Sequence, residues 1–362
     1  MSRRHILVVG NMGYVGPSVV AQLRASYPDA RLSGAEIGYF AHCLTGANVL
    51  PERALDYQHF IDIRRITPEA LVGVDAIVNL AAISNDPMGH AYERATDEIN
   101  FKAGIRLARL AKEAGVKSFV FASSCSVYGQ ADGAPRKETD PLNPLTAYAR
   151  SKIDTEIELE KLASRDFQVT ALRFPTACGM SDRLRLDLVL NDFVAGALTV
   201  GRIEILSDGT PWRPLIDTRD MARGIDWALQ RPRDGSREFL SINVGRNENN
   251  YQVKDLAYAV ARRLPGTETK INANAAPDKR SYQVDFSLYR ELAPDYLPAY
   301  SLDDSVSALI AGLRRMEFSN AKFRDSALIR LRVLNGLMTS GVLNERLEWS
   351  RPSAPLQHAV GE

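Results

Sequence analysis

The chain of 362 residues carries 45 basic and 44 acidic side chains, and 45% of its residues are hydrophobic. This composition excludes a disordered or fibrous protein, and a net charge of +1 gives no support to bulk electrostatic capture of nucleic acid or of an anionic membrane. The length suggests two domains, and no apolar run is long enough to predict a membrane span.

Short apolar runs alternate with helical patterns through the first half of the chain. The expected strands are 6–9, 31–36, 75–80, 117–122 and 168–173, and the expected helices are 14–25, 97–114 and 148–162. Such alternation predicts an α/β fold with a parallel sheet and helices on both of its faces.

The sequence pattern of the second half of the chain is less regular. After about residue 175 the segments become irregular and rich in turn formers, which predicts a smaller, loop-rich domain. Residues 317–349 return to a helical pattern, which we interpret as a surface helix, with a packing arm or an oligomer contact as alternatives. We therefore expect one domain over 1–175 with chain returns from the second half, a smaller domain over 176–316, and a helical extension and tail over 317–362.

The cysteines and histidines are sparse. Cys43, Cys125 and Cys178 form no Cys-x-x-Cys pair, and the five histidines never stand three to five positions apart. We expect no metal site and no disulfide framework, and this cysteine usage fits a reducing, cytoplasmic compartment.

A glycine-rich turn lies between the first expected strand and the first expected helix. Glycine there allows a tight turn and lets a pyrophosphate approach the backbone, while the helix N-terminus supplies unpaired N–H groups and a partial positive charge. The turn that we expect to bind a dinucleotide comprises Gly10, Met12, Gly13, Tyr14, Val15 and Gly16.

Glu36 stands at the end of the second expected strand. A carboxylate at this place accepts hydrogen bonds from a ribose 2′-hydroxyl and repels a 2′-phosphate, so we expect NAD rather than NADP. The alternative interpretation is a solvated loop carboxylate.

Tyr148 and Lys152 are four residues apart and share one face of an expected helix. A neighbouring ammonium lowers the pKa of a phenol and makes it a usable acid or base near neutral pH. The strand at 117–122 runs into Ser123 and Ser124, whose hydroxyls would point into the ligand crevice at the end of a parallel strand. The alternative is a serine-rich helix cap.

These three elements, in this order, resemble the extended short-chain dehydrogenase/reductase family, and more narrowly its nucleotide-sugar epimerase/dehydratase branch, over roughly residues 5–315. The resemblance implies a Rossmann-type doubly wound parallel sheet with a smaller C-terminal α/β domain for a nucleotide-diphosphate sugar. It also implies NAD as the cofactor and a homodimer formed through the helices at 97–114 and 148–162.

The resemblance also implies the roles of single residues. Tyr148 is the catalytic acid/base, Lys152 is its electrostatic partner, and Ser124 orients the sugar; Ser124 is chosen over Ser123 because it stands four residues before Tyr128. The cofactor-binding residues that the resemblance adds are Asp62, Ile63, Leu80, Ala81, Ala82, Asn100, Ser123, Lys152, Tyr148 and Pro175. The substrate-binding residues that we expect, from the resemblance or from their position in the sequence, are Asn85, Ser124, Ser126, Tyr148, Thr176, Arg185, Asn191, Arg213 and Arg280. Thr176 departs from the asparagine usual in this family, and Arg185 could equally be a surface charge.

The residues after Ser124 bear on the reaction. Sugar 4,6-dehydratases of this family carry an Asp-Glu pair at the positions of Cys125 and Ser126, so the sequence disfavours a dehydratase of that type. We interpret Cys125 as a small buried thiol. We therefore expect an NAD-dependent nucleotide-sugar epimerase that oxidises the sugar transiently at C4 and returns the hydride. The alternatives are a 4-ketoreductase or dehydrogenase of an activated (deoxy)sugar and a non-catalytic NAD-binding scaffold.

Overall fold

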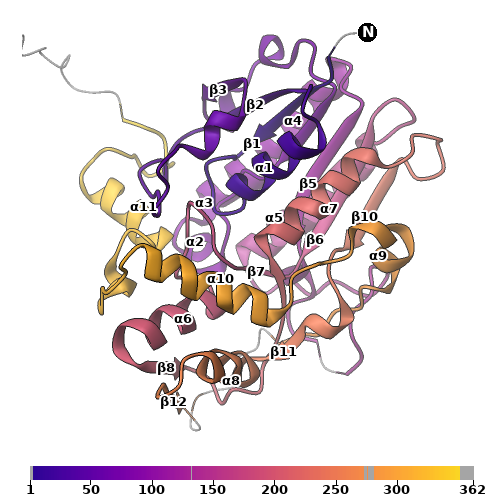
Figure 1. Ribbon diagram of the computed structural model, residues 1–362. Coiled ribbons are helices and arrows are strands. Elements are labelled where there is room, and N and C mark those ends of the chain that lie inside the picture. Colours follow the sequence, from indigo (N-terminus) through magenta and orange to yellow (C-terminus); the bar gives the residue numbers. More distant parts are fainter. Residues whose placement is uncertain (1–2, 132, 273–274, 276–280, 351–362) are drawn as a thin grey trace, which may run out of the picture.

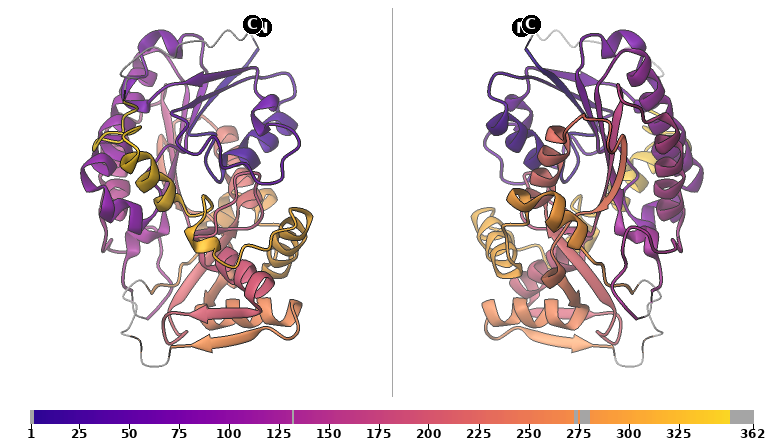
Figure 2. Two further views of the ribbon diagram at one scale, coloured as in Figure 1. Left: turned by 90° about the vertical axis from the view of Figure 1, so that its left-hand side faces the viewer. Right: turned by 90° about the vertical axis from the view of Figure 1, so that its right-hand side faces the viewer.

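The computed structural model describes residues 3–131, 133–272, 275 and 281–350. A large lobe holds a seven-stranded sheet between two layers of helices, and a small lobe lies at one end of it (Figures 1 and 2). The α-helices of the described residues are α1 (Gly16–Ser26), α2 (Asp86–Ala91), α3 (Glu93–Thr96), α4 (Gly104–Glu113), α5 (Ala147–Leu162), α6 (Val189–Val200), α7 (Thr218–Gln230), α8 (Val253–Arg263), α9 (Ser287–Leu292), α10 (Leu302–Arg315) and α11 (Arg330–Thr339). The strands are β1 (His5–Val9), β2 (Arg31–Glu36), β3 (Tyr57–Phe60), β4 (Ala76–Asn79), β5 (Ser118–Ser124), β6 (Gln168–Phe174), β7 (Thr176–Cys178), β8 (Arg202–Ile205), β9 (Trp212–Asp217), β10 (Phe239–Asn243), β11 (Asn250–Gln252) and β12 (Glu268–Ile271).

The large sheet has the strand order β10-β6-β5-β4-β1-β2-β3, and every neighbouring pair is parallel. Successive residues of one strand enter different cores: Ile6 and Val8 pack with α1 and α7, whereas Leu7 and Val9 pack with α4 and α5. Burial on both faces explains why these strands are continuous apolar runs. The prediction of a doubly wound parallel sheet is confirmed.

The strand order reverses between β1 and β4, which follow each other in space but not in sequence. In open parallel sheets, ligands bind in the crevice at such a reversal, beyond the carboxyl ends of the strands. Gly10, Leu80 and Ser124 stand at these ends or directly after them.

The small lobe contains a three-stranded sheet, β11-β9-β7, and a separate parallel pair, β12-β8. Helices α6, α8 and α10 pack into one apolar core with these strands. The lobe is therefore more regular than the loop-rich domain that we expected, because each of these helices buries one apolar face. Between its parts, α7 and β10 return to the large lobe, where β10 forms the edge of the seven-stranded sheet.

The expectation of a surface helix at the C-terminal end was wrong. Helical structure is confined to α11 and a short 3-10 turn, and Gly341 takes a left-handed conformation soon after α11 ends. Leu334 and Leu347 are fully buried in the core of the large lobe. Residues 330–349 therefore form a packing arm on the first half of the chain.

Two local expectations also differ from the structure. The helix predicted over 97–114 begins as a π-helical segment at Asp97–Ala103 before α4. Strand β3 was not predicted; it is an edge strand, and its Phe60 is 70% exposed. No helix of the described residues is long and apolar enough to cross a membrane.

Candidate active site

A cavity of about 1060 Å³ lies between the carboxyl ends of the large sheet and the small lobe. This volume exceeds the usual range for a single small ligand, roughly 300–1000 Å³. The predicted site residues that line the cavity are Gly10, Gly13, Tyr14, Val15, Gly16, Glu36, Asp62, Ile63, Leu80, Ala81, Ala82, Asn85, Ser123, Ser124, Ser126, Tyr148, Lys152, Pro175, Thr176, Arg185 and Arg213.

Three predicted residues among the described ones do not line it. The side chains of Asn100 and Asn191 are buried behind the wall, where Asn100 bonds both backbone groups of Ile83, and Asn191 bonds the amide of Gly179. Met12 contributes a backbone N–H to Glu36. Arg280 lies outside the described residues.

The glycines of the turn are needed for two different reasons. A Cβ atom on Gly10 would lie 2.6 Å from the amide nitrogen of Ala81, and one on Gly16 would lie 1.8 Å from the carbonyl oxygen of Asn11, so the fold itself requires both. A Cβ on Gly13 would meet nothing closer than 3.4 Å. Gly13 lines the cavity, so its missing side chain leaves room beside the start of α1, where a pyrophosphate needs it.

The carboxylate of Glu36 accepts hydrogen bonds from the amides of Gly38 at 3.1 Å and Met12 at 3.3 Å. Burial raises its pKa above the usual range, although these amides oppose the effect. A carboxylate has about four acceptor positions, so Glu36 can still accept hydrogen bonds from ribose hydroxyls. The turn and Glu36 together fit the phosphate and ribose groups of NAD.

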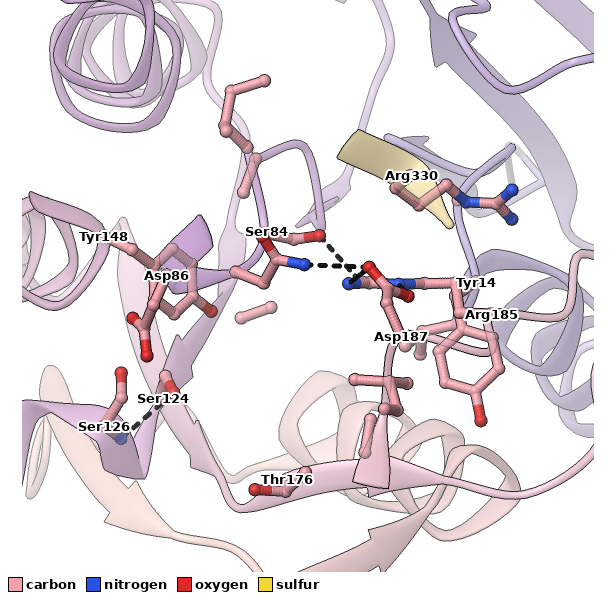
Figure 3. Close-up of a pocket in the computed structure, with 18 of the residues that line it drawn as sticks. Tyr14, Ser84, Asp86, Ser124, Ser126, Tyr148, Thr176, Arg185, Asp187 and Arg330 are labelled. Atoms are coloured by element: carbon pink, nitrogen blue, oxygen red, sulfur yellow. Dashed lines mark hydrogen bonds and ion pairs between the residues drawn. The ribbon is translucent and has the colours of Figure 1, made fainter. Parts of the chain in front are cut away.

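The predicted catalytic residues lie on the side of the cavity that β5 and α5 form (Figure 3). We call it the reactive side after that prediction. Ser124 ends β5 and accepts a hydrogen bond from the amide of Ser126 at 3.1 Å. Tyr148 is the second residue of α5, whose first turn is capped by the side chain of Thr146. The Ser124 hydroxyl lies near the phenol of Tyr148 and acts to lower its pKa.

Lys152 is buried one helical turn after Tyr148, and its ammonium donates to the carbonyl oxygen of Ala122 at 2.7 Å. Its Nζ lies 5.5 Å from the centre of the Tyr148 ring. Burial lowers the pKa of Lys152 to about 7 and raises that of Tyr148 to about 12. In the structure burial therefore outweighs the activation of the phenol that we expected from the lysine, because the ammonium is directed to a backbone carbonyl.

A buried ion pair lies behind Lys152. Glu156, one turn further along α5, binds Arg173 of β6 at 2.7 Å, and both side chains are 6% exposed. Glu156 also accepts hydrogen bonds from Ser123 and Ser241. The negative charge of Glu156 raises the pKa of Lys152 and so partly opposes the effect of burial.

Arg185 reaches the opposite side of the cavity (Figure 3). Its guanidinium forms a two-pronged pair with Asp187, with both contacts at 2.9 Å, and donates to the hydroxyl of Ser84 at 2.9 Å. The side-chain amide of Asn85 donates to the same Asp187 and its oxygen caps α2. The surface-charge alternative for Arg185 is wrong, since its side chain is only 7% exposed.

Sequence reasoning missed several carboxylates that line the cavity, namely Asp86, Asp187, Asp192 and Glu204, and Asp86 is the one beside Tyr148. Asp86 lies beside Tyr148 and Ser124 in Figure 3, and its carboxylate accepts a hydrogen bond from the Thr146 hydroxyl at 2.7 Å. Its charge raises the pKa of Tyr148. The segment at 84–88, which follows the third expected strand, was expected to border the sugar site, but no role was assigned to Asp86 because no sequence signal placed α2 against α5. Among the described residues, no group of three or more His, Cys, Asp or Glu side chains could hold a metal ion.

Known proteins share this architecture. The chain is 28% identical over 275 residues to the uncharacterized UDP-glucose epimerase YtcB of Bacillus subtilis, covering 74% of this chain and 83% of that protein. It is 25% identical to the dTDP-glucose 4,6-dehydratase of Streptomyces griseus, covering 85% and 93%. The solved structure of MoeE5 in complex with UDP-glucuronic acid and NAD superposes with a TM-score of 0.73 at 24% identity, over 86% of this chain and 99% of that one.

The sequence profile of the NAD dependent epimerase/dehydratase family matches residues 6–245, which include the glycine turn, Glu36 and the Tyr148–Lys152 pair. The family's cofactor is NAD, and the cavity described above has the groups to receive it. The chain therefore belongs to the NAD-dependent epimerase/dehydratase family of extended short-chain dehydrogenase/reductase enzymes.

Proposed function

We propose that this enzyme is a nucleotide-sugar 4-epimerase that oxidises the sugar transiently at C4. The observation that carries the proposal is the meeting of Ser124, Tyr148 and Lys152 in the same cavity as the glycine turn and Glu36. An acid/base hydroxyl thus faces the space next to the site for a dinucleotide.

The oxidised NAD ring, when bound, supplies a hydride acceptor and a positive charge. The Tyr148 oxygen takes the proton of the sugar C4 hydroxyl and later returns it, while the Ser124 hydroxyl holds the same sugar oxygen by a hydrogen bond. The ammonium of Lys152 is a proton donor next to the tyrosine ring, and its hydrogen bond to the carbonyl oxygen of Ala122 holds it in place. A positive charge near the phenol is needed to bring the pKa of Tyr148 down from about 12.

We propose that Gly10, Gly13 and Gly16 bind the pyrophosphate and that Glu36 binds the adenosine ribose. Thr176, Ser126 and Arg213 would contact the nucleotide sugar, with Arg185 and Asn85 on the facing wall. The regions 1–175 and 176–316 would then hold the cofactor and the sugar nucleotide respectively.

The test uses the purified protein with no added cofactor. It is incubated with UDP-, GDP-, dTDP- and CDP-sugars, and the products are identified by NMR and mass spectrometry. An epimerase yields an isomer of unchanged mass from one of them. A 4-ketoreductase instead consumes one reduced cofactor per product, and a scaffold changes neither sugar nor cofactor.

A dehydratase is the second candidate, because Asp86 brings a carboxylate to the reactive side that Cys125 and Ser126 do not offer. Removal of water needs an acid or base beyond the tyrosine. A product that is lighter than its substrate by the mass of one water molecule would favour the dehydratase over the epimerase.

We also propose a cytoplasmic homodimer. Its support is that α4 and α5 lie together on one outer face of the sheet, with Ile157 of α5 47% exposed, and that all three cysteines are free thiols. Analytical ultracentrifugation of wild-type protein and of Ile157→Glu tests the dimer, which the charged variant should dissociate.

A further inference from the structure

The end of the described chain folds back onto the loop that follows β2 (Figure 1). We call residues 343–349 the C-terminal strap. The indole N–H of Trp349 donates to the carbonyl oxygen of Ile37 at 2.8 Å, and the hydroxyl of Tyr39 donates to that of Leu347. The rings of Tyr39 and Trp349 pack with their centres 5.7 Å apart. The strap therefore fixes the loop that begins directly after Glu36.

The strap has one defined backbone conformation. Leu347 is fully buried and has a φ of 53°, a left-handed value that favours glycine. A leucine persists in such a conformation only where its surroundings hold it. Here its carbonyl oxygen accepts hydrogen bonds from Tyr39 and, at 3.2 Å, from Arg64.

Arg64 connects the strap to the cavity. One of its terminal nitrogens donates to the carbonyl oxygen of Arg346 at 2.7 Å, and the other binds the carboxylate of Asp62 at 2.6 Å. Glu98 lies within 3.6 Å of Arg64 and 3.2 Å of Arg346 and so joins both. Asp62 lines the cavity, on the side where Glu36, Ile37 and Tyr39 also do.

The strap is also anchored through α11. Arg330, the first residue of this helix, is 1% exposed and donates to the carbonyl oxygens of Arg183 at 2.8 Å and Leu184 at 3.2 Å. Its side chain lines the same cavity. Residues 330–349 therefore support one wall of the cavity, and Arg330 is itself part of that wall.

We propose that the C-terminal strap is a cofactor-retention element. By holding Asp62 through Arg64 and the loop after Glu36 through Trp349, it fixes the wall beside the adenosine half of NAD and slows NAD release. This inference rests on the proposed placement of the adenosine near Glu36. It deepens the proposed function, since an epimerase must keep its cofactor until the hydride has returned to the same sugar.

The test measures exchange of NAD in full-length protein with no sugar present. Protein loaded with NAD is mixed with excess deuterated NAD, and mass spectrometry follows the loss of the original cofactor. Trp349→Phe keeps an aromatic ring against Tyr39 while it removes the N–H donor and part of the indole, and Arg64→Lys keeps the charge but removes the two-pronged contact. Glu345→Gln, at an exposed position of the same strap, is the matched control.

We expect exchange to be faster by about tenfold in Trp349→Phe, the size expected for one lost hydrogen bond, and faster still in Arg64→Lys, with the control unchanged. Exchange at the wild-type rate in both variants would overturn the inference, as would a lower thermal midpoint without faster exchange, which would mean a structural role only. Rapid exchange in the wild-type protein that still forms an epimer would overturn the inference alone. Slow exchange without any sugar product would leave it standing and overturn the proposed function.

Discussion

The two ends of the cavity are built differently. The reactive end takes its groups from β5 and α5, which are neighbours in sequence as well as in space. The end that we propose for the adenosine combines the loop after β2 with the C-terminal strap, whose hydrogen bonds join residues more than 300 positions apart. The proposed reactive groups are thus placed by local structure, whereas the wall proposed for the adenosine depends on contacts that form only once the whole chain has folded.

The largest expected effect is at the reactive end. Tyr148→Phe removes one hydroxyl and should lower turnover by about 10²- to 10⁴-fold, the usual contribution of an acid/base group. NAD should still bind, because the adenosine end is untouched. Turnover is measured with the sugar found active, and Tyr258→Phe, at an exposed position of α8, is the control. Near wild-type turnover in Tyr148→Phe would remove the assigned acid/base.

The second prediction concerns the adenosine end. Glu36→Gln removes a negative charge that a 2′-phosphate would face, and like charges placed together cost on the order of a few kcal/mol. The preference for NAD over NADP should fall by about tenfold or more, with little change in turnover at saturating NAD. Isothermal titration calorimetry with both cofactors measures it, with Glu113→Gln on the exposed side of α4 as the control. An unchanged preference would separate Glu36 from ribose recognition.

A third prediction uses the buried lysine of the reactive end. The pKa of Lys152 is about 7 when folded and 10.5 when exposed. Between these values the unfolded chain holds more protons, so the free energy of unfolding should rise with pH by up to about 1.4 kcal/mol per pH unit. Urea denaturation of NAD-free protein at several pH values between 7 and 10 should show this rise, and Lys152→Met should lack it. Parallel curves for the two proteins would mean that the lysine is not desolvated.

The smallest effect distinguishes two left-handed residues other than glycine, Glu317 and Leu347. Glu317 is exposed with a φ of 51°, so Glu317→Gly should stabilise the protein by up to about 1 kcal/mol. Leu347→Gly relieves the same strain but removes a fully buried side chain, and should destabilise it by about 2 kcal/mol or more. Denaturation midpoints measure both. Equal changes would show that the strap is not packed as described.

Ser124, Tyr148 and Lys152 of the reactive end could be predicted from the sequence, and so could the bounds of several strands. The bounds of β2 were predicted correctly although Ser33 and Gly34 are poor strand formers, because the strand is buried on both sides. The turn at Gly10, the start of α5 and the end of β5 were each marked by a short motif.

The rest depends on packing that no local pattern records. Asp86 enters the cavity because α2 lies against α5, where a Cβ on Gly89 would come within 3.3 Å of Tyr148. The arm was taken for a surface helix because leucines at helical spacing do not reveal which surface will cover them. The sequence also gave no reason to expect that Arg64 would connect Asp62 to residues near the end of the chain.

One further contact lies at the meeting of the two lobes. The hydroxyl of Tyr14, in the glycine turn, donates to the carbonyl oxygen of Gly179 at 2.6 Å, and its own carbonyl oxygen accepts a hydrogen bond from Ser181 at 2.7 Å. Two hydrogen bonds thus tie the turn to the small lobe, and they form a direct path for coupling between ligands bound at the two places. If one ligand raises the affinity for the other by some factor, thermodynamic reciprocity requires that the second raises the affinity for the first by the same factor.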